Sequence, residues 1–386
     1  MGKRVCIFSA QYLPSSGGVE KYTFHIARLL GQNDVEVTIV TSDMYNAPLY
    51  EKESKIEVYR LPCFGLMNKR YPVVCFNKEF RKKIKQIFTN RYDLVITNTR
   101  FYPLSLLGTY YGKKYASKSI VIEHGTAHLS VQNKIGDILE QIFEHSITFL
   151  VKRNCSEFYG VSEACNEWLK HFQIQAKSTL YNAIDLNEIE DLYTKSKTFM
   201  RQTLNISREC IVIAFTGRIV KEKGIFQLVR AFGRVNKEFP NTRLVIAGDG
   251  PAMSELRKEC GENIYLLGKI PFSEVVLLLK ESDIFCLPSD SEGMPTSVLE
   301  AAACKNFVIT TARGGAKEII KDETYGLIIE DNNENTIFKA ISEVIHDEGY
   351  RHAASEKCYN RVKELFTWDK VVKKIQDELL CSNKGN

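Results

Sequence analysis

Short apolar runs alternate with amphipathic segments along the first half of the chain. Between the first two runs, the apolar residues of Val19–Leu30 recur at the three- and four-residue spacing of a helix. Such alternation predicts a parallel sheet whose strands are joined by crossover helices. The predicted strands of this half are Val5–Ala10, Glu36–Thr41, Leu94–Asn98 and Ser119–Glu123.

The second half repeats this scheme after a polar stretch that extends to Ser207. Its predicted strands are Ile211–Thr216, Arg243–Ala247, Ile264–Leu267, Ile284–Leu287, Phe307–Thr310 and Gly326–Ile329. Its predicted helices are Gln227–Glu238, Pro251–Cys260, Ser273–Lys280, Pro295–Cys304, Glu334–His346 and Tyr350–Leu380.

Two successive series of this kind predict two doubly wound domains, in which ligands bind beyond the carboxyl ends of the strands. With two such domains facing one another, we expect the site in the cleft between them. We place the first domain at residues 1–182 and the second at residues 183–364. Residues 365–386 are expected to form a helix that packs back on the first domain.

The composition is typical of a globular protein, with 44% hydrophobic and 26% charged residues in a chain of 386. No apolar run approaches the ~20 residues of a membrane span, and the apolar run near the start is too short for a secretory signal. We therefore expect a cytoplasmic protein. The 11 cysteines include no C-x-x-C pair, which favours buried thiols over a zinc site.

The net charge of +5 is unevenly distributed along the chain. Residues 1–180 carry 24 Lys and Arg against 16 Asp and Glu, a difference of +8, whereas the remainder carries 28 against 31. The stretch Lys69–Lys85 interleaves basic with aromatic residues. That pattern fits an anionic membrane surface or, alternatively, a solvated helix face. No nucleic-acid-binding motif accompanies the charge, so nucleic acid is not an expected partner.

Two glutamates stand eight residues apart in the segment 291–300, directly after a predicted strand. Pro295 suits the first position of a helix, whose unpaired N–H groups and positive dipole end would bind an anion. Glu292 and Glu300 would then lie on either side of that anion and accept hydrogen bonds from hydroxyl groups. The arrangement fits a sugar, a diphosphate and a ribose in a row; two solvated glutamates are the alternative.

Glycines and cations follow two other predicted strands. Gly17 and Gly18 open the first helix, where a backbone without side chains can approach an anion closely; a plain turn is the alternative. Arg218 and Lys223 flank a turn after the first strand of the second half. They form the usual pair of cations for a diphosphate, or alternatively a solvated surface pair.

A histidine follows the predicted strand Ser119–Glu123. His124 could donate a hydrogen bond to a sugar hydroxyl. His124 and His128 could instead share a metal ion from one helix face, but no third ligand is evident in the sequence, so we expect no metal site.

Taken in order, these motifs resemble those of retaining glycosyltransferases of the GT-B fold, in family 4 (glycosyl transferases group 1), over nearly the whole chain. The resemblance implies an α/β protein with two doubly wound, Rossmann-like domains that face a central cleft. One departure is Asn182-Ala183, where the family often has Asn-Gly. The motifs are G-G-V-E at 17–20, E-H-G at 123–125, N-A-I-D at 182–185, G-R-x4-K-G at 217–224, A-G-D-G-P at 247–251 and S-E-G-M-P-x4-E at 291–300.

The resemblance also implies a role for each motif, without a metal ion or other cofactor. Glu300 would bind the ribose of a nucleotide-sugar donor, and Arg218 with Lys223 would neutralise its diphosphate. The implied catalytic residues are His124, Glu292, Arg218 and Lys223. The implied donor-binding residues are Gly17, Gly18, Gly217, Arg218, Lys223, Glu292, Gly293, Met294, Pro295, Thr296, Ser297, Val298 and Glu300.

The expected reaction is transfer of a hexosyl group, with retention, from a UDP- or GDP-linked sugar to a hydroxyl group. Since no carboxylate is clearly placed as a nucleophile, front-face attack is our hypothesis. We expect the acceptor at residues 68–74 and 100–103, and a glycan or lipid-linked acceptor of bacterial surface polysaccharide synthesis. A sugar-nucleotide epimerase on the same fold, or a non-catalytic protein that binds nucleotides or carbohydrates, are the alternatives.

Overall fold

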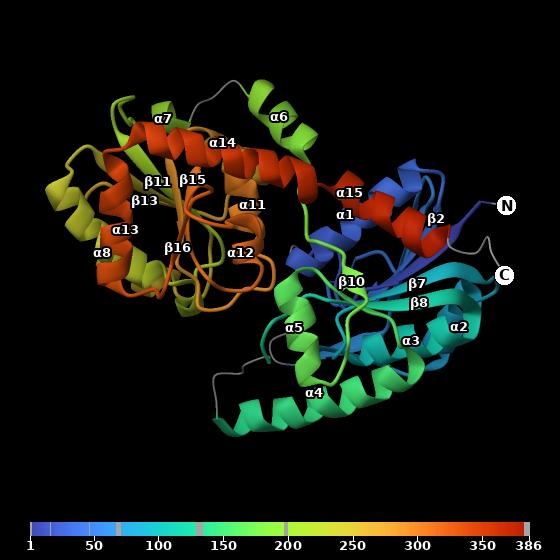
Figure 1. The fold of residues 1–386 in the computed structure, drawn as a ribbon. Helices are drawn as coiled ribbons and strands as arrows, with labels where there is room; N and C mark the ends of the chain where they lie inside the picture. Colours follow the sequence, from blue (N-terminus) through green and yellow to red (C-terminus); the bar gives the residue numbers. More distant parts are fainter. Residues whose placement is uncertain are drawn as a thin grey trace. The chain divides into compact units, whose positions relative to one another are not determined.

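The computed structural model describes residues 2–15, 17–45, 47–66, 71–128, 134–196 and 200–381. The chain forms two compact units, each built around a parallel sheet (Figure 1). The first unit comprises Met1–Asn182 and Trp368–Asn386, and the second comprises Ala183–Thr367. The chain therefore leaves the first unit once and returns to it at its end.

The main sheet of the first unit has the strand order β10-β9-β8-β7-β1-β2-β4-β3. Neighbouring strands are parallel except for the edge strand β3, which runs antiparallel to β4. The strands are β1 Arg4–Phe8, β2 Glu36–Ser42, β3 Tyr50–Glu53, β4 Ile56–Leu61, β7 Tyr92–Asn98, β8 Ala116–Glu123, β9 Phe158–Gly160 and β10 Ser178–Thr179, with a separate hairpin of β5 Cys63–Leu66 and β6 Tyr71–Val74.

The last helix of the chain, α15, packs on the first helix of the same unit, α1. The Trp368 ring meets the Tyr22 ring edge-on at 5.3 Å between centroids and stacks on the His25 ring at 4.9 Å. The helices of this unit are α1 Gly18–Gln32, α2 Lys78–Ile87, α3 Pro103–Tyr115, α4 Lys134–Asn154, α5 Glu163–His171 and α15 Trp368–Lys374, which continues as a π-helix over Ile375–Leu380.

The second unit contains a fully parallel sheet with the strand order β13-β12-β11-β14-β15-β16. Its strands are β11 Ile211–Thr216, β12 Thr242–Ala247, β13 Ile264–Gly268, β14 Ile284–Leu287, β15 Phe307–Thr311 and β16 Leu327–Ile329. Its helices are α6 Leu186–Thr194, α7 Met200–Thr203, η1 Lys221–Lys223, α8 Ile225–Glu238, α9 Met253–Glu259, α10 Phe272–Lys280, α11 Thr296–Ala303, α12 Ala316–Ile319, α13 Glu334–Ile345 and α14 Glu348–Leu365.

Each sheet has a point at which the strand order reverses. In the second unit β11 lies between β12 and β14, and in the first unit β1 lies between β2 and β7. The loops after the two central strands leave in opposite directions at such a point and open a crevice beyond their carboxyl ends, where ligands of α/β proteins bind. The candidate loops are therefore those after β11 and β14 and those after β1 and β7, together with the loop after β8, which leaves the same edge of the first sheet beside β7.

The structure changes one predicted helix. The segment Tyr350–Leu380 does not form one helix, because Phe366 (φ −117°, ψ 43°) and Thr367 are not helical and separate α14 from α15. The Ile184 N–H donates to the Phe366 carbonyl at 3.0 Å, and Ile184 forms a parallel bridge with Thr367. This pairing interrupts the helix where the chain returns to the first unit.

Candidate active site

The loops that follow β11 and β14 meet at the carboxyl ends of these adjacent strands. Lys223, at the end of the short helix η1, places its Nζ 2.5 Å from Oε1 of Glu292 in the second loop. The backbone N–H of Asp290 donates to the Glu222 carbonyl at 2.7 Å and joins the same two loops. The fold thus brings together a predicted cation and a predicted carboxylate from two different loops.

Two glycines allow the backbones of neighbouring loops to approach the loop after β14: Gly224 in the loop after β11, and Gly314 in the loop after β15. Gly224 has a φ of +67°, and a Cβ at this position would overlap the Pro288 carbonyl. Gly314 has a φ of +54°, and a Cβ there would overlap the carbonyls of Glu292 and Gly293. A larger residue at either position would displace the loop that carries Glu292.

Helix α11 begins directly after this loop. Pro295 is its N-cap, with φ −72° and ψ 94°, so the prediction that it is the first helical residue is wrong by one position. Met294 and Val298 are buried, whereas Thr296, Ser297 and Glu300 are partly exposed. Because the first N–H groups of a helix have no partner within it, this end of α11 offers donors for an anion beside Lys223 and Glu292.

The second predicted cation lies on the same loop as Lys223. Arg218 follows Gly217 and is exposed. The neighbouring Ile219 N–H donates at 3.0 Å to the carbonyl of Asp249, which follows β12. The loop after β12 therefore supports the backbone beside Arg218.

In the first unit, the predicted glycines lie at the start of α1. Gly17 is the N-cap and Gly18 the first helical residue. The buried Glu20 carboxylate lies beside them and accepts a hydrogen bond from Ser15 Oγ at 3.2 Å. Glu20 belongs to the G-G-V-E motif, but no role was predicted for it; its position shows that it shapes the glycine loop.

His124 follows β8 in a segment that is not helical. Its Nε2 lies 3.2 Å from Asn98 Oδ1, and its ring meets the Tyr22 ring edge-on at 4.8 Å. Asn98 Nδ2 donates to Thr23 Oγ1 at 2.8 Å, so Asn98 Oδ1 is the acceptor and His124 Nε2 carries the proton. Burial lowers the pKa of His124 to about 3, which makes the ring a neutral hydrogen-bonding group.

A buried ion network lies under His124 and was not predicted. Arg100, Glu123 and Glu144 are each no more than 1% exposed. Arg100 Nη1 lies 2.9 Å from Glu123 Oε2, and Arg100 Nη2 pairs with Glu144 Oε1. The other oxygen of Glu123 accepts the backbone N–H groups of His124 and Gly125 at 3.0 and 2.9 Å. The network therefore fixes the loop that carries His124.

The same burial corrects part of the predicted acceptor surface. Arg100 was expected to contact the acceptor, but its guanidinium is enclosed by Glu123, Glu144 and the Phe172 ring, whose centroid lies 3.8 Å from Cζ. Tyr71 is also buried and donates to the Phe101 carbonyl at 2.6 Å. Residues 68–70 of that surface lie outside the described residues.

Two family models match this chain. The model described as "Glycosyltransferase Family 4" matches residues 16–188, and the one described as "Glycosyl transferases group 1" matches residues 196–361. The first match lies in the first unit up to Asn182, and the second contains the loops that carry Arg218, Lys223, Glu292 and Glu300.

Curated relatives and solved structures match over nearly the whole chain. An uncharacterized glycosyltransferase of Methanocaldococcus jannaschii is 26% identical, covering 97% of each chain. A GDP-mannose-dependent monoacylated alpha-(1-6)-phosphatidylinositol monomannoside mannosyltransferase of Corynebacterium glutamicum is 24% identical, covering 95% of each. Among solved structures, HepE from Anabaena in complex with UDP and glucose superposes with a TM-score of 0.75 at 16% identity, covering 98% of this chain and 99% of that one.

Proposed function

Because the chain belongs to the group 1 glycosyl transferases and has the GT-B fold, we propose that it transfers a hexosyl group, with retention, from a nucleotide sugar to a lipid-linked glycan. The observation that carries this proposal is the grouping of Lys223, Glu292 and the N-terminal end of α11 at the carboxyl ends of β11 and β14. A cation and the N–H groups of a helix start suit a diphosphate, and a carboxylate suits the hydroxyl groups of a sugar.

We propose that charge on the leaving diphosphate is stabilised by Lys223, Arg218 and the backbone N–H groups of Thr296 and Ser297. These groups stand where negative charge develops as the anomeric bond breaks, and this is the interaction through which such sites accelerate reactions. Glu292 accepts hydrogen bonds from the sugar. In the front-face mechanism, the acceptor oxygen attacks from the side of the leaving group, whose phosphate oxygen takes the acceptor proton.

For the donor we propose a UDP- or GDP-linked hexose. The Anabaena structure contains UDP and glucose, and the corynebacterial relative is named as GDP-mannose-dependent. Neither likeness is close enough to choose between the two bases, since the identities are 16% and 24%.

A two-step assay tests the proposed reaction. The purified protein is first screened with UDP- and GDP-linked sugars for an increase in unfolding temperature, since a ligand that binds the native state stabilises it. The stabilising donor is then incubated with and without a lipid-linked glycan. Transfer only in the presence of acceptor supports the proposal; an isomerised donor without acceptor would identify an epimerase, and binding without either product would identify a non-catalytic binding protein.

We expect Glu300→Ala to weaken donor binding by roughly 10–100-fold, because a carboxylate that accepts hydroxyl hydrogen bonds contributes about 1.5–3 kcal/mol. The dissociation constant of the donor is measured by calorimetry. Glu259→Ala is the matched control, since Glu259 lies on α9 in an exposed pair with Arg230. A donor affinity unchanged by Glu300→Ala would remove Glu300 from the site.

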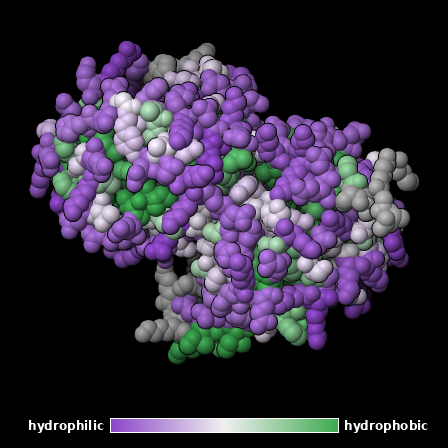
Figure 2. Space-filling view, in the orientation of Figure 1, coloured by the Kyte–Doolittle hydropathy of each residue, from purple (hydrophilic) through white to green (hydrophobic). Residues whose placement is uncertain are grey.

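Helix α4 supports a lipid-linked acceptor, because its exposed face is apolar. The face appears as the hydrophobic patch at the bottom edge of the molecule in Figure 2. Ile135, Ile138, Leu139, Ile142 and Phe149 recur at helical spacing and are 56–72% exposed. An exposed helix face of this kind is typical of helices that lie in a membrane interface. Among the helices of the described residues, none is long and apolar enough to cross a membrane.

Basic side chains accompany α4 near its end. Lys113 Nζ donates to the Arg153 carbonyl at 3.1 Å, and the Arg153 guanidinium lies 4.7 Å from the centroid of the Phe149 ring. The predicted basic stretch Lys69–Lys85 contributes less apolar surface than expected, because Phe80 is buried in the core. Lys69 and Arg70 lie outside the described residues. We therefore propose that α4, rather than this stretch, supplies the apolar contact with an anionic membrane.

The double variant Ile138→Glu with Ile142→Glu is expected to lose binding to vesicles of anionic phospholipid, because two buried charges would oppose insertion of the helix face. Co-flotation with vesicles measures binding. Leu49→Glu is the control, since Leu49 is 42% exposed and lies before β3, away from α4 in the sequence. Equal flotation of the wild-type protein and the α4 double variant would exclude this helix as the contact.

A further inference from the structure

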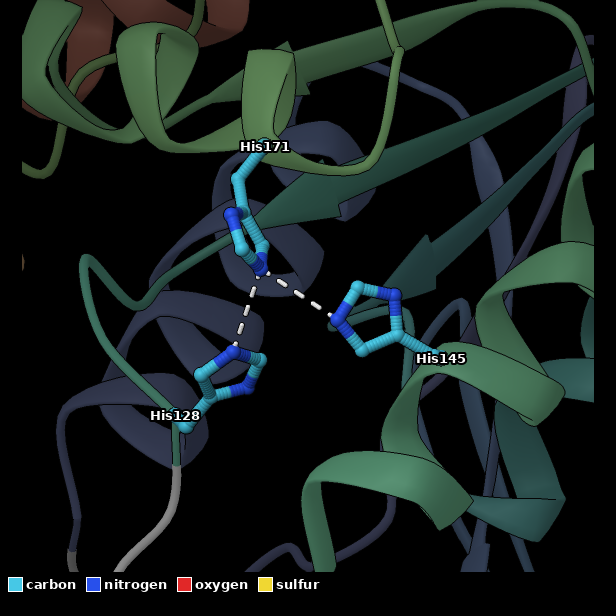
Figure 3. Close-up of side chains that lie close together, drawn as sticks. All are labelled: His128, His145 and His171. Carbon is cyan, nitrogen blue, oxygen red and sulfur yellow. Dashed lines mark hydrogen bonds between the residues drawn. The ribbon is translucent and has the colours of Figure 1, made fainter. Parts of the chain in front are cut away.

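Three histidine rings converge in the first unit (Figure 3). His128 lies in the loop after β8, His145 lies on α4 and His171 is the last residue of α5. The Nε2 atom of His171 lies 3.2 Å from Nε2 of His128 and 3.2 Å from Nε2 of His145. Each ring therefore offers one ligand nitrogen, and these three atoms all lie within 4.8 Å of one another.

A buried carboxylate fixes the state of the first ring. His128 Nδ1 lies 2.6 Å from Glu144 Oε2, and Glu144 is 1% exposed and paired with Arg100. Because a carboxylate can only accept, Nδ1 of His128 carries a proton, and in this tautomer Nε2 is the atom that offers a lone pair to a metal ion. Histidines that bind a metal through one ring nitrogen usually donate a hydrogen bond from the other nitrogen to a carboxylate or a carbonyl.

Hydrogen bonding among the three rings does not satisfy all of them. A neutral imidazole Nε2 carries either one proton or one lone pair. If His171 Nε2 donates its proton to His128, His171 Nε2 has no lone pair that could accept a hydrogen bond from His145. The two neighbouring rings must then share the one proton of His171 Nε2. A cation at the centre would instead accept one lone pair from each ring. Ligands at the usual Zn–N distance of about 2.0–2.1 Å in a tetrahedron are about 3.3 Å apart, close to the two Nε2–Nε2 separations of 3.2 Å.

Aromatic side chains surround the three rings. The Trp168 ring stacks on His171 with centroids 4.9 Å apart and planes 3° apart, and the Phe172 ring lies 4.7 Å from His145. Neutral imidazoles with an aromatic shell are ligands for borderline transition metals rather than for Mg²⁺ or Ca²⁺.

We propose that His128, His145 and His171 bind a divalent transition-metal ion, with Zn²⁺ as the best match, and leave a fourth position for water. The ion would join the loop after β8 to α4 and α5. The sequence predicts no metal site and pairs His128 only with His124. The structure shows why that pairing is wrong: the segment is not helical, and the other two ligands lie in α4 and α5.

This site is separate from the proposed transfer chemistry, since no residue assigned to the donor is a ligand. It is connected to His124 through Glu144, Arg100 and Glu123. Bound metal would therefore stabilise the loop that carries His124 without taking part in bond breaking.

Titration of the tag-free full chain with Zn²⁺ tests the proposal by calorimetry. We expect one ion per chain in the wild-type protein. His145→Asn and His171→Asn should each weaken affinity at least tenfold; both residues are exposed, so the fold should persist. His352→Asn is the matched control, because His352 is exposed on α14 in the second unit. No binding by the wild-type protein, or equal binding by the His145 and His171 variants, would overturn the proposal.

Substitution with Co²⁺ gives a second readout that does not depend on enzymatic activity. Tetrahedral coordination by three imidazoles and water produces intense visible absorption, which should appear on titration of the wild-type protein and be lost in His171→Asn. Co²⁺ should also quench the fluorescence of Trp168, which stacks on His171. Weak absorption typical of the hydrated ion throughout the titration would show that the three rings form only an aromatic cluster.

Discussion

Replacement of Lys223 by alanine is expected to lower the turnover number by about 10²–10³-fold, the effect of removing one preorganised donor from a developing anion, or about 3–4 kcal/mol. Lys223 is three-quarters buried and already held 2.5 Å from Glu292, so its charge is fixed in place before the donor binds. Arg218→Ala should have a smaller but parallel effect, since Arg218 is exposed and more strongly screened by water.

Lys221→Ala is the matched control for both variants. Lys221 lies on the same short helix as Lys223, but it is exposed and paired with Glu255 on α9. Steady-state kinetics with the sugar nucleotide that stabilises the protein give the turnover number and the Michaelis constant separately. If Lys223→Ala and Arg218→Ala both turn over at the wild-type rate, the diphosphate does not bind at this loop.

The largest expected loss of stability comes from Arg100→Ala. This substitution leaves the carboxylates of Glu123 and Glu144 buried without their cation, a change that costs about 3–5 kcal/mol in the free energy of unfolding. Both tryptophans, Trp168 and Trp368, belong to the first unit, so tryptophan fluorescence during urea unfolding follows that unit selectively.

Arg91→Ala is a suitable control for this measurement, because Arg91 is exposed just before β7. Further substitutions test whether the buried negative charge causes the loss of stability. Glu123→Gln and Glu144→Gln in the Arg100→Ala background remove the buried negative charge and should recover part of the stability. A loss below about 1 kcal/mol in Arg100→Ala would mean that water reaches these carboxylates in the native state.

The sequence predicts the parallel strands of the second unit well. The bounds of β11 and β14 are the same in the prediction and in the structure. The reason is physical: a parallel strand covered on both faces is apolar at every position, and such a run stands out from its polar flanks. Edge strands such as β3, with its exposed sequence Tyr50–Glu53, carry no such signal and were missed.

Helix α4 is not predicted from the sequence, because its apolar residues lie on the exposed face. A helix of a globular protein usually alternates a buried apolar face with an exposed polar one. In α4 the buried face includes Glu140 and Glu144, while the exposed face carries Ile138 and Ile142. The pattern of apolar residues therefore gives the wrong orientation, and only the fold shows which face is covered.

Some residues of the site can be predicted from the sequence and others cannot. Lys223 and Glu292 are found from sequence because each lies in a loop that follows a predicted strand, and topology brings those strand ends together. The histidine cluster and the Arg100–Glu144 pair are not, because their members lie 17–44 residues apart on a loop, two helices and a strand end. The spacing of residues along the sequence does not show that these side chains lie close together in the fold.

The return of the chain at Trp368 has a consequence for engineering. Ala183–Thr367 is one continuous segment, and its two ends lie side by side, since Ile184 bonds to Phe366 and bridges to Thr367. The second unit is therefore inserted into the first at two neighbouring points of the chain. This makes it suitable for exchange with the corresponding unit of a related protein. A fragment that ends at Asn182 lacks Trp368. The rings of Tyr22 and His25, which contact Trp368 in the full chain, are then uncovered.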